Sequence, residues 1–479
     1  MQAIPGDLLA IDRQGRAKTP SLNLELRNST QRVCDFDEVL LPFSPEQAIF
    51  EAARCIHCPD PAPCVRACPA ENDIPSAMWL IEQGRFLDAA DLYRQTSSMP
   101  EICSRVCPHE ALCQGSCVMG KHEEPVQTGM LERFVTDYQR YVGELSIDVA
   151  EPTGKRVAVI GAGPSGIACA EQLARAGHDV TIFDAKPQPG GLLLYGIPNF
   201  KLEKDVVFAR VDDLFRMGVK FVGNTFIGRD KTIDQLEAEG FQAFYIATGT
   251  WIDSPMNVDG ENLPGVWKGT EFLIRANVKT AYLPDDMKDR PEIGKKVVVI
   301  GGGDTASDCL RTALRMGAEE VTCVYRRTEN EMPGGSKDRK LAREEGASYQ
   351  FLTQPLRFIA GSDGHLAAIE CMRMELGEPD ASGRRKPMPV EGSEFLIEAD
   401  TAILALGYWP DETIGKTTPQ LETHKYGLIV TGKTTGQTTR PGVYAGGDAV
   451  TGPDLVVTAM TAGRRAAEAI DSYLRTRVN

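Results

Sequence analysis

The 479-residue chain is 42% hydrophobic and 25% charged, proportions ordinary for a globular protein of roughly three domains at about 150 residues each. Its formal net charge of −15 argues against nucleic acid or an anionic membrane surface as a partner, since both are negatively charged and bind to basic surfaces. The sequence has no apolar run near the ~18 residues of a membrane span and no signal-peptide pattern at its N-terminus, so we expect a cytoplasmic protein.

Cysteines are concentrated in the first quarter of the chain. Nine of the thirteen fall between Cys34 and Cys117, and without a secretory signal such clustering indicates metal or cluster ligands rather than disulfides. Proline directly follows Cys68 and Cys107, as in two-cluster ferredoxins, where the fourth cysteine of one run ligates the other cluster. Two zinc knuckles are the alternative, because thiolates suit both metals. The candidate ligands are Cys55, Cys58, Cys64, Cys68, Cys103, Cys107, Cys113 and Cys117.

Helices are expected around these cysteines. Ser44 and Gln47 predict a capping box at a helix start, and two more helices are expected over residues 74–83 and 86–95. A polar connection at residues 141–155 predicts a domain boundary near residue 150.

A glycine pattern at the start of the next segment predicts a dinucleotide site. A buried strand over residues 157–160 runs into Gly161-x-Gly163-x-x-Gly166 and then into a helix. The first glycine permits the tight turn, the second lets the backbone approach a pyrophosphate, and the third allows close helix–strand packing. Pyrophosphate then binds the free N–H groups at the helix N-terminus, and an acid at the end of the next strand suits a ribose hydroxyl. The candidate residues are Gly161, Gly163, Pro164, Ser165, Gly166 and Asp184.

Two further segments complete this first site. A glycine-rich loop occupies residues 190–198, and a later strand ends in Gly-Asp before a helix expected over residues 455–474. A carboxylate and helix N-terminal amides in that place suit the ribityl-phosphate region of a flavin. The candidate residues are Gly190, Gly191, Leu192, Gly447 and Asp448.

A second glycine pattern repeats the first one and predicts a second nucleotide site. The difference lies at the end of the following strand, where Arg326 and Arg327 stand in place of an acid. Guanidinium binds a 2′-phosphate that an acid would repel, so we expect NADP(H) here, with an exposed pair of surface arginines as the alternative. Lys337 and Arg339 are weaker additional candidates. The glycine-turn candidates are Gly301, Gly303, Asp304, Thr305 and Ala306.

Taken together, these motifs are similar to those of a known family. Over residues 40–475 the chain resembles the small (beta) subunits of NADPH-dependent glutamate synthase, within the wider family of iron–sulfur flavoprotein NADPH oxidoreductases. The matching motifs lie at residues 103–108, 112–117, 161–166, 190–198, 201–204, 301–306, 325–327, 332–334 and 446–448.

The resemblance implies an α/β fold with two Rossmann-like nucleotide-binding domains of glutathione-reductase type, preceded by an all-α iron–sulfur domain. It implies a helical domain with two [4Fe–4S] clusters at residues 1–150. An FAD domain is expected at residues 151–270 and 408–479, and an NADPH domain at residues 271–407.

The resemblance also implies how the cysteines are shared between the clusters. One cluster falls to Cys55, Cys58, Cys64 and Cys117, although five residues separate Cys58 from Cys64 where relatives have four or fewer. The other falls to Cys68, Cys107 and Cys113, with Cys103 and Glu132 competing as the fourth ligand.

The function implied is that of an electron-entry subunit. Hydride passes from NADPH to FAD, and electrons leave singly through the clusters to the larger alpha subunit of glutamate synthase or another protein acceptor. No catalytic acid or base is expected, and the chain has neither an N-terminal nucleophile nor an eight-fold βα repeat for glutamate synthesis itself. One alternative is an NADPH-dependent reductase of ferredoxin or another partner oxidoreductase. The other is a non-catalytic redox sensor or scaffold that binds nucleotides.

Overall fold

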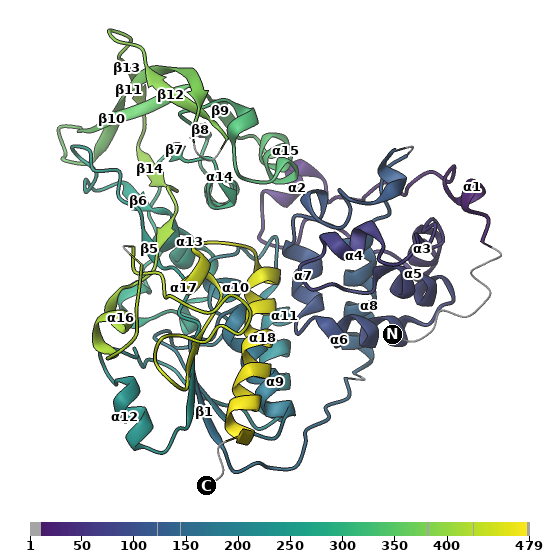
Figure 1. Cartoon of the computed structure of the whole chain (residues 1–479). Helices are drawn as coiled ribbons and strands as arrows, with labels where there is room; N and C mark the ends of the chain where they lie inside the picture. The colour runs from purple at the N-terminus through teal and green to yellow at the C-terminus, as the bar shows by residue number, and fades with distance from the viewer. Residues whose placement is uncertain (1–10, 122, 144, 381–382, 425, 477–479) are drawn as a thin grey trace.

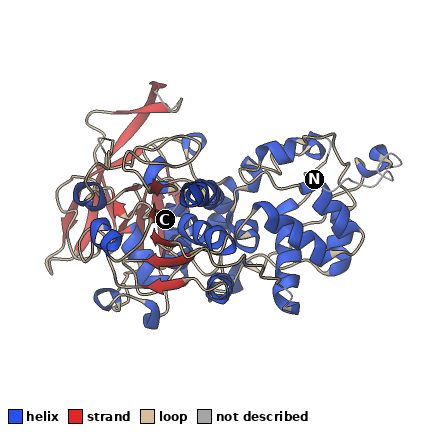
Figure 2. Cartoon of the chain, turned by 60° about the horizontal axis from the view of Figure 1, so that its bottom comes forward, coloured by secondary structure: helices blue, strands red, loops and turns tan. Residues whose placement is uncertain are grey.

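The computed structural model describes residues 11–121, 123–143, 145–380, 383–424 and 426–476. Figure 1 shows a helical N-terminal part beside two α/β units, and Figure 2 shows that the strands lie apart from the helical part. None of the helices in these ranges is both long and apolar enough to cross a lipid bilayer.

The N-terminal part is built from helices around a compact apolar core. The predicted capping box is confirmed, because Ser44 Oγ accepts a hydrogen bond from the Gln47 N–H at 3.2 Å and Gln47 Oε1 accepts one from the Ser44 N–H at 2.8 Å. Met78, Tyr93 and Leu131 are buried where the longer helices meet. The helices are α1 (Arg13–Arg16), α2 (Ser29–Arg32), α3 (Pro45–Ala52), α4 (Pro63–Ala67), α5 (Ile74–Glu82), α6 (Phe86–Thr96), α7 (Pro100–Val106) and α8 (Thr128–Val142).

The first α/β unit is a parallel five-stranded sheet in the order β16-β4-β1-β2-β3. Its strands are β1 (Arg156–Ile160), β2 (Asp179–Phe183), β3 (Lys220–Val222), β4 (Ala243–Ile246) and β16 (Val443–Ala445). Apolar side chains project from both faces of β1, because helices cover both faces of a parallel sheet. The face of Val157 and Val159 packs against α9 (Pro164–Arg175), α11 (Lys204–Arg216) and α18 (Val456–Thr476), and α12 (Ile233–Ala238) and α16 (Thr413–Thr417) cover the other face. Helix α18 also lies beside the helical part (Figure 1).

The second α/β unit repeats this plan in the order β6-β14-β7-β8-β9. The strands are β6 (Val266–Lys268), β7 (Lys296–Ile300), β8 (Glu320–Val324), β9 (Ser348–Gln350) and β14 (Thr401–Leu404). Helices α13 (Gly269–Asn277), α14 (Asp304–Arg315) and α15 (Ser336–Glu344) cover one face. Because β6 pairs with β14, this sheet already begins upstream of residue 271, the start of the NADPH domain predicted from the sequence.

An antiparallel sheet covers the other face of the second unit, and a short ribbon joins the two units. The antiparallel strands are β10 (Thr353–Ala360), β11 (Leu366–Pro379), β12 (Arg385–Pro389) and β13 (Phe395–Glu398). The ribbon pairs β5 (Ile252–Asp253) with β15 (Tyr408–Trp409), the two crossings between the units. The fold is therefore the predicted one, two Rossmann-type α/β units preceded by an all-α part.

Candidate functional site

The first glycine turn connects β1 to α9. Gly161 has a φ of +107°, and a Cβ built on it would lie 2.3 Å from the carbonyl oxygen of Ala247, so no other residue fits without moving β4's end. Gly163 is the N-cap of α9 and Pro164 stands in its first turn. The free N–H groups of that turn therefore face a space that side chains do not fill, as an anionic ligand requires.

The turn opens onto a pocket that we call the first nucleotide pocket. Eight of the residues predicted to hold FAD line it together: Gly161, Gly163, Pro164, Ser165, Asp184, Gly191, Leu192 and Asp448. Gly166 lies behind the turn, Gly190 donates its N–H to Ala162 O at 2.9 Å, and Gly447 is the N-cap of α17 (Asp448–Thr451). Sequence reasoning missed Thr248, Gly249 and Trp251, which also line the pocket. The turn that ends the buried strand β4 was the available signal.

Two carboxylates in this pocket, those of Asp184 and Asp448, are partly buried. Burial raises the pKa of Asp184, although the N–H groups of Lys186 and Ala162 oppose this by donating to its two oxygens, each at 2.7 Å. Each oxygen keeps a lone pair for a ribose hydroxyl. Burial, followed by the charge of Asp454, raises the pKa of Asp448 to about 7.

The second glycine turn has the same construction. Gly301 has a φ of +147°, and a Cβ on it would lie 2.2 Å from Ala405 O. The segment just before α15 lies against this turn. Gly334 donates its N–H to Gly302 O at 3.1 Å, and Gly335 donates its N–H to Asp304 Oδ1 at 2.8 Å. Thr305 Oγ1 lies 2.5 Å from the hydroxyl of Tyr408 on the connecting ribbon, and Ala306 is buried against the sheet.

The structure separates the four basic residues predicted for the 2′-phosphate. Arg326 is exposed, whereas Arg327 is buried and donates to Arg385 O and to Asp380 Oδ2, each at 2.7 Å. Arg339 donates to Gly334 O. Lys337 lies in a different cavity, described below. Arg326 and Lys337 are the two of the four that are exposed, and of these Arg326 is the one at the end of β8.

Five predicted cluster ligands line one pocket in the helical part, which we call the cysteine pocket. They are Cys68, Cys103, Cys107, Cys113 and Glu132. Burial and then the charge of Glu101 raise the pKa of Glu132 to about 8, and Asn72 donates to its Oε1 at 3.4 Å. A hydrogen bond with Cys103 and then burial raise the pKa of Cys107. This donor set is rich in sulfur and carries one carboxylate, Glu132, which forms no salt bridge with another described residue.

The other four candidate cysteines influence one another. Burial, and then the neighbouring thiols of Cys55, Cys117 and Cys58, raise the pKa of Cys64 to about 12. A bound metal reverses this effect, because a coordinating thiol is deprotonated. Across the described ranges, no three His, Cys, Asp or Glu side chains meet at a point suited to a single metal ion.

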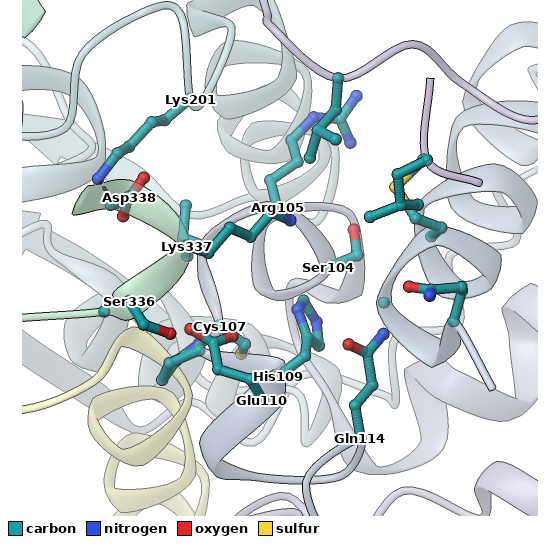
Figure 3. Close-up of a pocket in the computed structure, with 18 of the residues that line it drawn as sticks. Ser104, Arg105, Cys107, His109, Glu110, Gln114, Lys201, Ser336, Lys337 and Asp338 are labelled. Atoms are coloured by element: carbon teal, nitrogen blue, oxygen red, sulfur yellow. Dashed lines mark hydrogen bonds and ion pairs between the residues drawn. The ribbon is translucent and has the colours of Figure 1, made fainter. Parts of the chain in front are cut away.

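A cavity of about 1120 Å³ lies where the helical part and both α/β units meet, and we call it the central cavity. Figure 3 shows Lys337 and Asp338 of α15 on one side and Cys107, His109 and Glu110 of the helical part on the other. Burial lowers the pKa of His109 to about 3, so this imidazole is neutral.

The start of α18 stands between these spaces. Leu455 and Val456 line both the first nucleotide pocket and the central cavity, and Val457 lines the cysteine pocket. One turn of helix therefore separates the predicted flavin site from the second group of predicted cluster ligands.

Comparisons with known proteins show the family of the chain. Residues 32–144 match the family described as dihydropyrimidine dehydrogenase domain II, 4Fe–4S cluster, and residues 155–463 match the pyridine nucleotide-disulphide oxidoreductase family. The small chain of NADPH glutamate synthase from Escherichia coli (strain K12) is 41% identical over 471 residues, covering 97% of this chain and 98% of that one. The chain belongs to this family of iron–sulfur flavoprotein NADPH oxidoreductases.

Another member is equally similar. The protein AegA of Escherichia coli (strain K12) is 42% identical over 471 residues, covering 96% of this chain and 70% of that one. The solved structure of Mycobacterium tuberculosis FprA in complex with NADPH has the same fold over 68% of this chain and 85% of its own, with a TM-score of 0.56 and 19% identity.

As a member of this family the protein is an NADPH-dependent oxidoreductase with FAD and 4Fe–4S chemistry. The residues present fit these groups. The first glycine turn leaves N–H groups and Asp184 facing an open pocket, as FAD requires. The cysteine pocket offers thiols and a buried carboxylate, a donor set suited to an iron–sulfur cluster.

Proposed function

We propose that this chain is an electron-entry subunit in the cytoplasm, which oxidises NADPH at FAD and passes electrons through two [4Fe–4S] clusters to a larger partner. The partner we favour is the large subunit of glutamate synthase, which forms glutamate from glutamine and 2-oxoglutarate. The observation that carries the proposal is the place of Val456 and Val457, neighbours in the chain that line the first nucleotide pocket and the cysteine pocket.

In this proposal FAD occupies the first nucleotide pocket. The N-terminal amides of α9 bind its pyrophosphate, Asp184 binds a ribose hydroxyl, and Asp448 with the N-terminus of α17 faces the ribityl-phosphate region. When bound, FAD takes hydride from NADPH and the clusters carry single electrons, which is cofactor chemistry that the protein positions. We assign residues 151–270 and 408–479 to the FAD domain and residues 271–407 to the NADPH domain, except that β6 belongs to the sheet of the second unit.

NADPH is assigned to the second glycine turn. The N-terminal amides of α14 bind its pyrophosphate, and Arg326 binds the 2′-phosphate. Arg327 supports this arrangement indirectly, since its hydrogen bonds to Asp380 and Arg385 fix the β11–β12 hairpin beside the end of β8.

For the cluster nearer the flavin we propose the ligands Cys68, Cys107, Cys113 and Glu132. Glu132 is favoured over Cys103 because it is only 7% exposed, and a buried carboxylate without a cation is costly. Cluster iron supplies that cation, whereas a buried thiol such as that of Cys103 behaves as a small apolar group and needs none. The remaining ligands, Cys55, Cys58, Cys64 and Cys117, hold the outer cluster.

The choice of partner rests on the 41% identity to the glutamate synthase small chain, which extends over 98% of that chain. AegA is as similar in sequence, so the alternative is a reductase that serves ferredoxin or another partner oxidoreductase.

The test is anaerobic purification of the full chain, with assays for iron, sulfide and flavin. We expect brown protein that oxidises NADPH with an artificial acceptor, forms no glutamate alone, and forms glutamate when the large subunit is added. Glutamate formation by the chain alone would contradict the proposal, and colourless protein containing zinc would contradict its iron–sulfur part. If NADPH oxidation is present but the large subunit is not reduced, the ferredoxin alternative applies.

A further inference from the structure

The residues that follow the glycine-rich loop, 199–201, contact the helical part and the second unit. Lys201 Nζ lies 2.5 Å from Asp308 Oδ1 on α14 and 2.8 Å from Asp338 Oδ2 on α15. Lys201 and Asp338 face one another at the edge of the central cavity (Figure 3). The side chains of Lys201 and Asp308 are only 16% and 9% exposed, so the contact is screened weakly by solvent.

Phe200, the residue before Lys201, packs against two arginines of α14. Its ring is 1% exposed and lies 4.5 Å from the guanidinium carbon of Arg311 and 4.1 Å from that of Arg315. Both arginines bind Glu345 at the end of α15, with the closest contacts at 2.9 Å and 2.7 Å. The tip of the loop therefore fits a preformed charged surface of the second unit.

The N-terminal segment closes the same junction from the other side. Val39 donates its N–H to Phe200 O at 3.2 Å, and Asn199 Nδ2 donates to Phe36 O at 2.9 Å. Arg32 binds Glu345 at 2.8 Å. All three parts of the molecule thus meet at residues 199–201.

The other end of this loop belongs to the first nucleotide pocket, where Gly191 and Leu192 form part of the wall. The loop between is braced, because the buried ammonium of Lys204 donates to Leu193 O at 2.8 Å and to Ile197 O at 2.5 Å. This braced loop therefore connects the contacts of Lys201 with the second unit to the wall of the first nucleotide pocket.

We propose that Lys201 is a positioning residue, whose ion pairs with Asp308 and Asp338 hold the second unit where NADPH can deliver its hydride to FAD. Hydride transfer moves two electrons and one hydrogen from NADPH to FAD and leaves NADP⁺, and it requires the reacting atoms about 3–3.5 Å apart. A buried ion pair defines such an alignment because it loses its geometry on a small shift. The inference rests on NADPH oxidation at the flavin and is independent of the partner's identity.

The test is anaerobic stopped-flow reduction of the holoprotein by NADPH. For K201M we expect the limiting rate of flavin reduction to fall about 10- to 100-fold, because a misalignment of about 1 Å costs this much. The NADPH concentration at half-maximal rate should change less than about 3-fold, since the phosphate contacts stay within the second unit. Reduction by dithionite should be unchanged. The matched control is K220M, which breaks an exposed Lys–Asp pair of 2.7 Å between β3 and β2 of the first unit.

Two further variants keep the test decisive if K201M folds poorly. K201R should restore the limiting rate to within about 3-fold of the wild-type value. D338N should lower the limiting rate, but less than K201M does, because Lys201 stays paired with Asp308. A wild-type limiting rate in K201M would overturn the inference. A rise in the NADPH concentration at half-maximal rate, with an unchanged limiting rate, would also overturn the inference and would make Lys201 a nucleotide ligand. Failure of the wild-type chain to be reduced by NADPH would instead contradict the oxidoreductase function.

Discussion

The two α/β units share one type of glycine turn, to which we assign two different nucleotides. In both, a glycine with positive φ lies against the carbonyl of the strand end beside it, Ala247 in the first unit and Ala405 in the second. They differ at the next strand end, where the first has the partly buried acid Asp184 and the second the exposed Arg326. They also differ in their neighbours, because α18 joins the first unit to the helical part. In our proposal the turn binds a dinucleotide in both units, and the residues around it determine which dinucleotide binds and where its electrons go.

The largest effect is expected from breaking each turn separately. G161A and G301A both place a Cβ within about 2.3 Å of a carbonyl oxygen at a strained φ. We expect G161A to be purified without FAD. G301A should retain FAD that dithionite reduces but should lose at least about 100-fold in NADPH oxidation. Flavin content and steady-state rates measure both, and loss of FAD in G301A would contradict the assignment of the two sites.

A second comparison concerns the connection from the first unit to the clusters. Because Glu132 is proposed as a ligand and Cys103 as a neighbour, E132A should lose about half of the iron and sulfide. C103S should keep both clusters. Iron and sulfide assays on anaerobically prepared protein measure this, and the opposite pattern would assign Cys103 as the ligand.

The two arginines at the end of β8 offer a matched pair. R326A should lower kcat/KM for NADPH about 10- to 100-fold and leave kcat/KM for NADH unchanged, because it removes charge-assisted hydrogen bonds to the 2′-phosphate alone. R327A should chiefly lower the thermal stability, since its partners Asp380 and Arg385 belong to the hairpin. A larger change in nucleotide preference in R327A would reverse these roles.

The smallest effect is expected from pH. The pKa of Asp448 is raised from 3.8 to about 7 in the folded chain, so the folded state binds more protons than the unfolded state between these values. This contribution to the stability of the flavin-free protein is complete below about pH 4 and is lost as the pH rises through about 7. Thermal unfolding of wild type and D448N over this range should show a flatter pH dependence in D448N. Parallel curves would contradict it.

Local geometry could be predicted from the sequence, and contacts between distant segments could not. The strand–turn–helix units were predictable because glycine spacing, strand burial and the capping box at Ser44 are short-range properties. The pairing of Arg327 with Asp380, fifty-three positions away, could not be predicted, since no local sequence pattern indicates that these two residues meet. Lys337 was a phosphate candidate by its charge alone, yet helix α15 directs it into the central cavity. The junction at residues 199–201 was missed for the same reason.

The central claim is that electrons leave the flavin through the cysteine pocket and reach the outer cluster only afterwards. Rapid-freeze electron paramagnetic resonance of NADPH-reduced protein tests it in two variants. In C58S, which disables the outer cluster, the account predicts that the cluster of the cysteine pocket is still reduced at the wild-type rate. In C113S, which disables that inner cluster, it predicts reduced flavin with an outer cluster that stays oxidised during turnover. Reduction of the outer cluster in C113S at the wild-type rate would contradict the account.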